Sequence, residues 1–175
     1  PLADAAKQRG VGVFHLNIGQ PDIETPPEFV RVVREWNQPV LEYGNSKGDG
    51  RLIASAIGYY KRQLGVTLGP EHVQITTGGS EALLFAILAV AGPGDEIVVF
   101  EPFYTNYNGF AIMSGVKLVP IGTSIADGYH LPPRAEIEKH VGPRTRAILL
   151  CSPNNPTGTV YSRQEMEAVA EVCRQ

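Results

Sequence analysis

The stretch AILLCSPNNPTG, from Ala147 to Gly158, begins as an apolar run and ends as a loop containing two prolines, two asparagines and a glycine. An apolar run that stops at such a loop is typical of a buried strand and the turn at its carboxyl end. A turn that only reverses the chain would explain the loop as well as a binding loop does. The rest of the sequence has to decide between them.

Short β-rich runs recur on both sides of this stretch and are separated by segments long enough to hold helices. The runs are VQITT (73–77), EIVVF (96–100), KLVPI (117–121) and AILLC (147–151). Strands that alternate with helical crossovers are typical of a parallel sheet covered by helices. The sequence therefore predicts an α/β fold with a mostly parallel sheet and helices on both faces.

The helices are marked by their ends and by their apolar patterns. Consecutive prolines after Thr25 predict one helix start, and a second helix is expected from Asp49, which can cap it, to Gly65. The run ALLFAILAV (82–90) is apolar on nearly all sides and predicts a buried helix. A capping box from Ser162 to Glu165 opens a last helix, expected to pack on the sheet.

Composition limits the kinds of partner. The 175 residues carry a net charge of −3 and no cluster of basic residues, so neither nucleic acid nor an anionic membrane is an expected partner. The two cysteines, Cys151 and Cys173, have no disulfide or metal-ligand spacing, and neither a signal peptide nor a spanning apolar run is present. A cytoplasmic location is expected, and both ends of the sequence look cut.

The loop after VQITT offers a candidate phosphate site. Gly78, Gly79 and Ser80 stand at the start of the apolar helix, where free backbone N–H groups, a hydroxyl and the helix dipole favour an anion. Neither a Walker lysine nor the G-x-G-x-x-G fingerprint is present. A simple tight turn with Ser80 as the helix cap explains the same residues.

The loop after EIVVF carries aromatic rings. In EPFY (101–104), Phe103 and Tyr104 follow a proline. A ring held by a stiff loop can stack on a planar ligand. Packing in the core is the other explanation, and the segment by itself favours it.

Taken together, five segments resemble the class I/II pyridoxal-phosphate aminotransferases of fold type I, in the order that the family has them. The segments are NIGQPD (17–22), Tyr43 with Gly48, TTGGSEAL (76–83), EPFY (101–104) and SPNNPTG (152–158). The last of these is the most specific. The resemblance implies pyridoxal 5′-phosphate as cofactor, and an amino acid and a 2-oxo acid as substrates.

The resemblance also implies roles for residues around the cofactor. Gly79, Ser80 and Glu81 would bind the phosphate, chiefly through backbone N–H groups, with the Glu81 carboxylate turned away. Tyr104 would stack on the pyridine ring. Asn155, before an expected cis bond to Pro156, would donate a hydrogen bond to the ring hydroxyl and would border the substrate.

Other implied residues lie nearer the start of the chain. Ile18 and Gly19 would border the carboxylate side of the substrate. Tyr43 would reach across a homodimer interface to the partner's phosphate. The resemblance also divides the chain into part of a small domain (residues 1–45) and the first half of a large, cofactor-binding domain (residues 46–175).

The Schiff-base lysine of the family is missing from this sequence, as are the acid for the pyridine nitrogen and the arginine for the substrate carboxylate. None of the five lysines has the family's serine-and-lysine context, and Lys47 in NSKGDG is interpreted as a surface residue. We therefore expect an amino-terminal portion that is inactive as it stands.

Two other functions are compatible with parts of the sequence. A dinucleotide-dependent hydride-transfer enzyme fits the fold class, but its glycine fingerprint and ribose-binding acid are lacking. A non-enzymatic sensor that binds the cofactor or an amino compound stays open, because a fold does not fix an activity.

Overall fold

The computed structural model describes residues 2–15, 19 and 21–174. By its internal contacts the chain divides into two compact units, residues 1–43 and residues 44–175. The sheet and the loops that follow its strands all belong to the second unit.

The first unit contains two short helices, α1 (Leu2–Gln8) and α2 (Pro27–Arg34). Helix α2 begins at the predicted prolines, because proline at the first helical position needs no partner for an N–H. No side chain described in either helix is buried. The apolar side chains of and next to α2 are exposed, namely Phe29, Val32, Val33 and Trp36.

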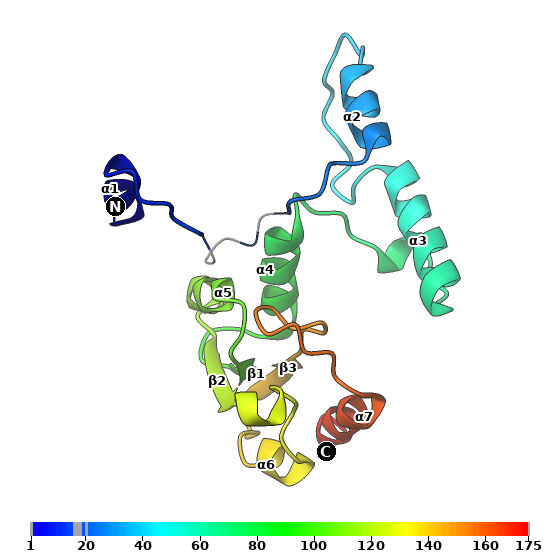
Figure 1. Cartoon of the computed structure of the whole chain (residues 1–175). Helices are drawn as coiled ribbons and strands as arrows, with labels where there is room; N and C mark the ends of the chain where they lie inside the picture. Colours follow the sequence, from blue (N-terminus) through cyan, green and yellow to red (C-terminus); the bar gives the residue numbers. More distant parts are fainter. Residues whose placement is uncertain (1, 16–18, 20, 175) are drawn as a thin grey trace. The chain divides into compact units, whose positions relative to one another are not determined.

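The core of the second unit is a parallel sheet of three strands in the order β2-β1-β3 (Figure 1). The strands are β1 (Glu96–Glu101), β2 (Lys117–Gly122) and β3 (Thr145–Leu149). In the middle of the sheet, Val98 is paired with Val119 on one side and with Ile148 on the other. Three of the four predicted strands are therefore confirmed.

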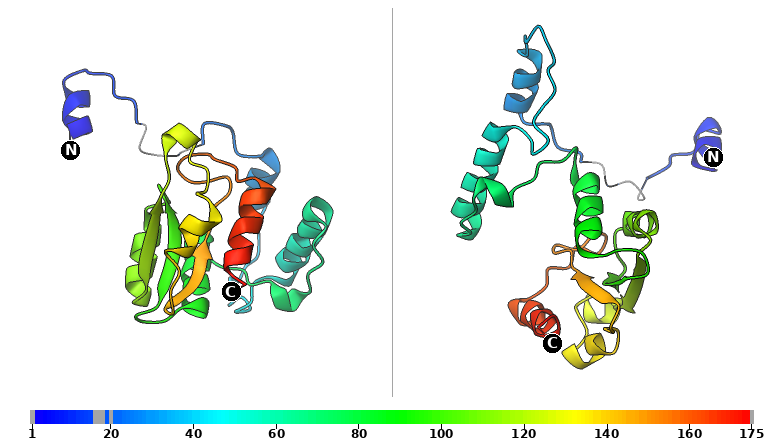
Figure 2. Two further views of the ribbon diagram at one scale, coloured as in Figure 1. Left: turned by 90° about the horizontal axis from the view of Figure 1, so that it is seen from below. Right: turned by 180° about the vertical axis from the view of Figure 1, so that it is seen from behind.

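Helices cover both faces of this sheet, as the sequence predicts. On one face α4 (Gly79–Val90) and α5 (Asn106–Ser114) pack with Val99 into one apolar cluster. On the other face α6 (Arg134–Glu138) and α7 (Arg163–Val172) pack with Val98 into a second cluster. Neighbouring residues of β1 thus point to opposite layers. Figure 2 shows the ribbon of the sheet and its helices from two further sides.

The predicted helix ends are also confirmed. Helix α3 (Gly50–Leu64) is capped by Asp49, which accepts hydrogen bonds from the N–H groups of Arg51 and Leu52. It ends at Gly65, whose φ of +68° is the left-handed conformation that glycine adopts without steric cost. Ser162 and Glu165 form the capping box of α7. Two 3-10 turns, Pro70–His72 and Ile125–Asp127, complete the described elements.

Two predictions about packing are wrong. Residues 73–77 form no strand, because the Ile75 N–H donates to the carbonyl of Lys47, in a loop, instead of to a neighbouring strand. Helix α4 is buried on one side only. Ile87 is buried at 3% exposure, whereas Phe85 and Leu88 on other sides of the helix are about half exposed, at 47% and 54%.

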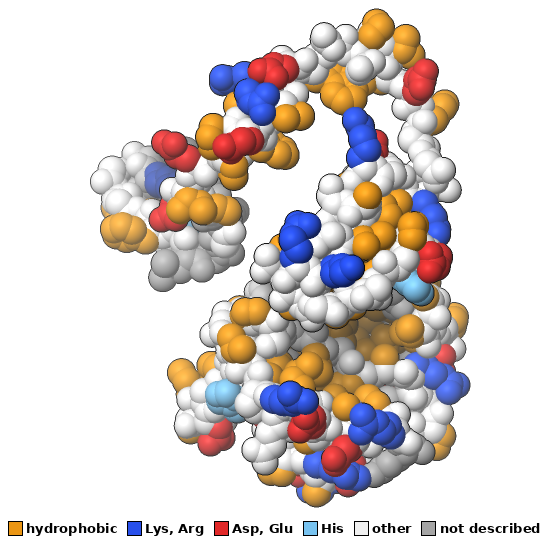
Figure 3. Space-filling view, turned by 90° about the vertical axis from the view of Figure 1, so that its right-hand side faces the viewer, with side chains coloured by type: hydrophobic (Ala, Val, Ile, Leu, Met, Phe, Trp, Pro, Cys, Tyr) orange, Lys and Arg blue, Asp and Glu red, His pale blue; other side chains and the backbone are white. Residues whose placement is uncertain are grey.

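Exposed apolar side chains are not confined to α4. The face of the chain in Figure 3 carries several of them over α3, where Leu52 and Leu64 are exposed. Among the described residues, no helix is long and apolar enough to cross a membrane.

Candidate functional site

The first turn of α4 leaves hydrogen-bond donors free. Gly78, at the N-cap with a φ of +110°, precedes the helix, and the first helical bond runs from Ala82 N–H to the Gly78 carbonyl at 3.3 Å. Within the described part of the chain, the backbone N–H groups of Gly79, Ser80 and Glu81 donate to no acceptor. Ser80 is exposed and lies inside the helix, so Gly78, rather than Ser80, is the cap.

The chain that leads into this turn is braced by side chains. The Glu81 carboxylate accepts the Thr77 N–H at 2.6 Å, and the Thr76 hydroxyl donates to the Gly78 carbonyl at 2.9 Å. The negative charge of Glu81 is therefore held at residue 77 by a charge-assisted hydrogen bond.

The loop after β1 holds its two aromatic rings differently. Phe103 stacks on the buried ring of Tyr107, with 5.9 Å between centroids and 17° between planes. Tyr104 meets Tyr107 edge-on at 5.6 Å, is partly exposed, and its hydroxyl accepts a hydrogen bond from Asn106 at 2.7 Å. Phe103 thus packs against the core. Tyr104 also contacts the core, but part of its ring is exposed.

The loop after β3 contains two adjacent asparagines in opposite environments. Asn155 is exposed, whereas Asn154 is buried at 8% exposure and donates from Nδ2 to the Pro102 carbonyl at 3.1 Å. This bond joins the loop after β3 to the loop after β1. The Asn155–Pro156 peptide bond is cis, as the resemblance implies.

Sequence reasoning missed Asn154. In a loop the sequence has no periodicity that separates a buried residue from an exposed one. Two neighbouring asparagines therefore look equivalent until their partners are known.

Beneath these loops the protein is tightly packed. Tyr107, Cys151 and Tyr161 are among the residues around a cavity of about 10 Å³, which has room for no more than a water molecule. Burial, with a contribution from Cys151, raises the pKa of Tyr107 to about 12, so its phenol stays neutral at physiological pH. A ligand would have to lie above the loops, since the packing below them leaves no space.

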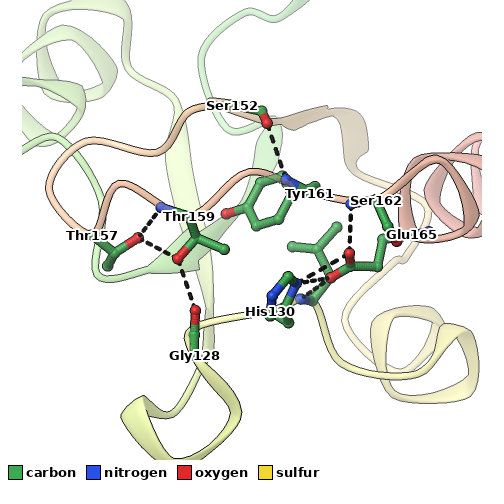
Figure 4. A network of polar contacts seen from close by, with 9 residues as sticks. Gly128, His130, Ser152, Thr157, Thr159, Tyr161, Ser162 and Glu165 are labelled. Atoms are coloured by element: carbon green, nitrogen blue, oxygen red, sulfur yellow. Dashed lines mark hydrogen bonds and ion pairs between the residues drawn. The ribbon is translucent and has the colours of Figure 1, made fainter.

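A polar network fixes the far side of the loop after β3 (Figure 4). Thr159 donates from its hydroxyl to the Gly128 carbonyl at 2.8 Å, and Thr157 donates to Thr159 at 2.9 Å. The Ser152 hydroxyl accepts the Tyr161 N–H at 3.1 Å, which closes the base of the loop.

Glu165 joins this base to the segment before α6. Its carboxylate accepts the Leu131 N–H at 2.8 Å and the Ser162 N–H at 2.7 Å, and lies 3.0 Å from His130 Nδ1. Burial raises the pKa of this carboxyl, but the hydrogen bonds from Ser162, Leu131 and His130 outweigh burial and lower the pKa to about 2.

The remaining predicted site residues lie in the first unit. Gly19 and Tyr43 are both exposed. Ile18 lies outside the described residues. The structure therefore joins the loops that carry Tyr104 and Asn155, and describes the α4 turn as a separate feature of the same unit.

The chemistry of these groups suits a phosphate ester of a planar ring. Free N–H groups, a hydroxyl and the positive end of a twelve-residue helix favour an anion. A partly open tyrosine ring and an exposed amide can stack on a ring and donate to it. No cluster of histidine, cysteine and acidic residues in the described ranges could hold a metal ion.

Comparison with known proteins gives a consistent result. The family model for aminotransferase class I and II matches residues 11–175. The bifunctional aspartate aminotransferase and glutamate/aspartate-prephenate aminotransferase of Petunia hybrida is 31% identical over 97% of this chain and 36% of its own length. The probable N-succinyldiaminopimelate aminotransferase of Mycobacterium tuberculosis is 35% identical over 93% of this chain and 41% of its own length.

A solved structure agrees with the two sequences. A mutant aspartate aminotransferase of Thermus thermophilus superposes with a TM-score of 0.89 at 31% identity, over 99% of this chain and 45% of that one. The chain thus spans less than half the length of these relatives. From its sequence, its loops and its fold, this chain belongs to the class I and II aminotransferases, proteins of fold type I.

Proposed function

We propose that this chain is the cofactor-holding portion of a pyridoxal 5′-phosphate-dependent aminotransferase that moves an amino group between an amino acid and a 2-oxo acid. The observation that carries the proposal is the first turn of α4, where three consecutive N–H groups have no acceptor in the described chain. The relatives reported above are named as aminotransferases, which favours an enzyme over a non-enzymatic sensor.

In this proposal the α4 turn binds the phosphate. The N–H groups of Gly79, Ser80 and Glu81 and the Ser80 hydroxyl donate to its oxygens, as helix N-termini do for anions. The bond from Thr77 to the Glu81 carboxylate supports this assignment, because it keeps the negative charge occupied at residue 77. A glycine at position 79 adds no side chain to this surface, and a Cβ there would meet no atom within 4 Å.

The two joined loops hold the ring. Tyr104 stacks on its face, and Asn155 donates to the ring hydroxyl and borders the substrate. Their support is the partly open ring of Tyr104 and the exposed amide of Asn155, which has no hydrogen-bond partner among the residues that the structure describes. When bound, pyridoxal phosphate would supply the carbonyl carbon and the electron-withdrawing ring that transamination requires. This chain's residues orient that ring by stacking and by hydrogen bonds.

The first unit completes the proposed assembly. Residues 1–45 belong to the small domain and residues 46–175 to the large domain, with Ile18 and Gly19 on the carboxylate side of the substrate. Tyr43 reaches the phosphate site of a second subunit in a homodimer, and its full exposure supports a role outside its own unit. The two free cysteines support a cytoplasmic location.

Titration with inorganic phosphate and with pyridoxal 5′-phosphate tests the proposal. Ser80→Ala should lower the affinity for both ligands severalfold, because it removes one hydrogen-bond donor, the hydroxyl, at the turn. Ser162→Ala is the matched control. It also removes a serine from a helix N-terminus, but one where Ser162 and Glu165 already satisfy each other, so phosphate affinity should not change. Equal effects of the two substitutions, or no phosphate binding by the unaltered chain, would contradict the proposal.

A further inference from the structure

Of the two residues Tyr43 and Gly48, which together form one of the five segments of the resemblance, the proposed function gives a role only to Tyr43. The φ of Gly48 is +105°, a conformation that residues with a side chain rarely adopt. A glycine in such a conformation is often only the hinge of a turn. The surroundings of Gly48 show a second requirement.

The loop that contains Gly48 lies directly against the segment that leads to α4. The Ile75 backbone N–H donates to the Lys47 carbonyl at 3.0 Å, and the side-chain amide Nε2 of Gln74 donates to the Ser46 carbonyl at 2.8 Å. A Cβ built on Gly48 would overlap the Cβ of Ile75 and would come within 2.6 Å of its Cγ1. Any side chain at position 48 must therefore push the two segments apart.

A displacement of Ile75 would reach the phosphate turn. Only Thr76 and Thr77 separate Ile75 from Gly78, and each is bonded onward, Thr76 to the Gly78 carbonyl and Thr77 to Glu81. The first turn of α4 is thus connected to the 45–48 loop by a short, hydrogen-bonded chain. The close contact between Gly48 and Ile75 therefore fixes where this series of hydrogen bonds begins.

We propose that Gly48 is a positioning residue: its lack of a side chain lets residues 74–77 lie against the 45–48 loop, and this contact orients the N–H groups of Gly79 and Ser80. The inference rests on the proposed function, because it concerns the turn assigned to phosphate. It assigns to Gly48 no contact with the ligand.

The experiment compares two glycines that share a positive φ. Gly48→Ala adds a side chain where Ile75 stands, whereas Gly65→Ala adds one at a φ of +68° with no atom within 4 Å. Both substitutions should lower the midpoint of thermal unfolding. Only Gly48→Ala should lower the affinity for inorganic phosphate and for pyridoxal 5′-phosphate, by about tenfold, because misplaced N–H donors bind the phosphate oxygens poorly.

A double variant separates the contact from the backbone conformation. Combining Gly48→Ala with Ile75→Gly removes the atoms that the new Cβ would meet, and phosphate affinity should recover to that of Ile75→Gly alone. If Gly48→Ala does not fold, recovery of a folded, phosphate-binding chain in the double variant supports the proposal. A double variant that stays as impaired as Gly48→Ala overturns it, because the backbone conformation alone would then demand glycine.

Amide hydrogen exchange gives a reading that needs no ligand. The Ile75 and Thr77 amides, which donate to Lys47 and Glu81, should exchange faster in Gly48→Ala than in Gly65→Ala. Unchanged exchange at both amides, or phosphate affinity within about twofold of the unaltered chain, overturns the role of Gly48. If the unaltered chain binds no phosphate, the proposed function fails, and the exchange rates alone decide about Gly48.

Discussion

Asn154 and Asn155 differ only in what surrounds them, and that difference should separate stability from binding. Asn154→Ala removes the donor to the Pro102 carbonyl at a buried position and should lower the free energy of unfolding by about 1–3 kcal/mol. Asn155→Ala changes an exposed side chain and should stay within about 0.5 kcal/mol. Urea unfolding of both variants without ligand measures this.

For binding of pyridoxal 5′-phosphate, we expect Asn155 to matter, although its side chain contributes little to stability. Asn155→Ala should weaken this binding while the fold is intact, because the proposed donor to the ring hydroxyl is lost. A large stability loss in Asn155→Ala, or none in Asn154→Ala, would show that the two side chains have been assigned to the wrong roles.

The aromatic residues of the loop after β1 allow a second paired comparison. Tyr104→Ala should lower the affinity for pyridoxal 5′-phosphate about fivefold or more, because a stacked ring adds on the order of 1 kcal/mol to binding beyond burial. Phe103→Ala, which removes a partly buried ring stacked on Tyr107, should cost about 1–3 kcal/mol of stability, the usual range for a destabilising single substitution. Titration and thermal unfolding are measured on both.

Tyr104→Phe is the control for this pair. It keeps the ring and loses only the hydrogen bond from Asn106, so cofactor binding should be nearly retained. Unchanged affinity in Tyr104→Ala, together with a lower unfolding temperature, would assign Tyr104 to the core.

At the scale of elements, strands and helix ends could be predicted from local pattern, whereas pairing could not. β1 and the 73–77 segment are both short β-rich runs, yet only β1 finds strands on either side. Ile75 instead donates to Lys47, a partner that lies in a loop. A strand exists only with a neighbour, and a local sequence pattern does not say which neighbour is available.

The same limit applies to the site. The glycine turn and the asparagine loop could be found by residue type and by resemblance. The bond from Asn154 to Pro102 and the contact of Gly48 with Ile75 join segments far apart in sequence, 52 residues apart in the first case. Such contacts depend on the folded chain, so no local pattern reports them.

The junction between α7 and the segment before α6 should respond to acid. The pKa of Glu165 is lowered from 4.5 to about 2 in the folded chain, so its stabilisation is complete above pH 4.5 and is lost as the pH falls toward 2. A shift of this size is worth on the order of 3 kcal/mol. Unfolding free energies from pH 7 to pH 2 should show this loss.

Glu165→Gln tests the assignment of that acid response. The amide cannot titrate, so the difference in stability between the two proteins should be largest at neutral pH and should shrink as Glu165 becomes protonated. Asp49, whose pKa is also lowered to about 2, titrates in both proteins and cancels in the difference. A difference that is constant with pH would contradict the role of Glu165.

For the molecule as a whole, the exposed apolar surface has a consequence in solution. Strand β3 lies at an edge of the sheet as described, and large apolar side chains are exposed over several helices, among them Leu52, Leu64, Phe85, Leu88 and Met113. Open strand edges and apolar patches promote association. We therefore expect the 175-residue chain, purified alone, to form folded oligomers that light scattering detects; a monodisperse monomer would contradict this expectation.

The same isolated chain should have no transaminase activity, because none of its five lysines stands in the serine-and-lysine context that the family uses for covalent capture of the cofactor. Lys117 begins β2, at the end of the sheet away from the binding loops, and is paired with Glu96. Lys47 is the strongest exception, since its carbonyl bonds Ile75 near the approach to α4, but its side chain is exposed. Incubation with pyridoxal 5′-phosphate, reduction with borohydride and peptide mapping should show only scattered, substoichiometric labelling. Stoichiometric labelling of Lys47 that disappears in Lys47→Arg would show instead that the 45–48 loop carries the reactive lysine.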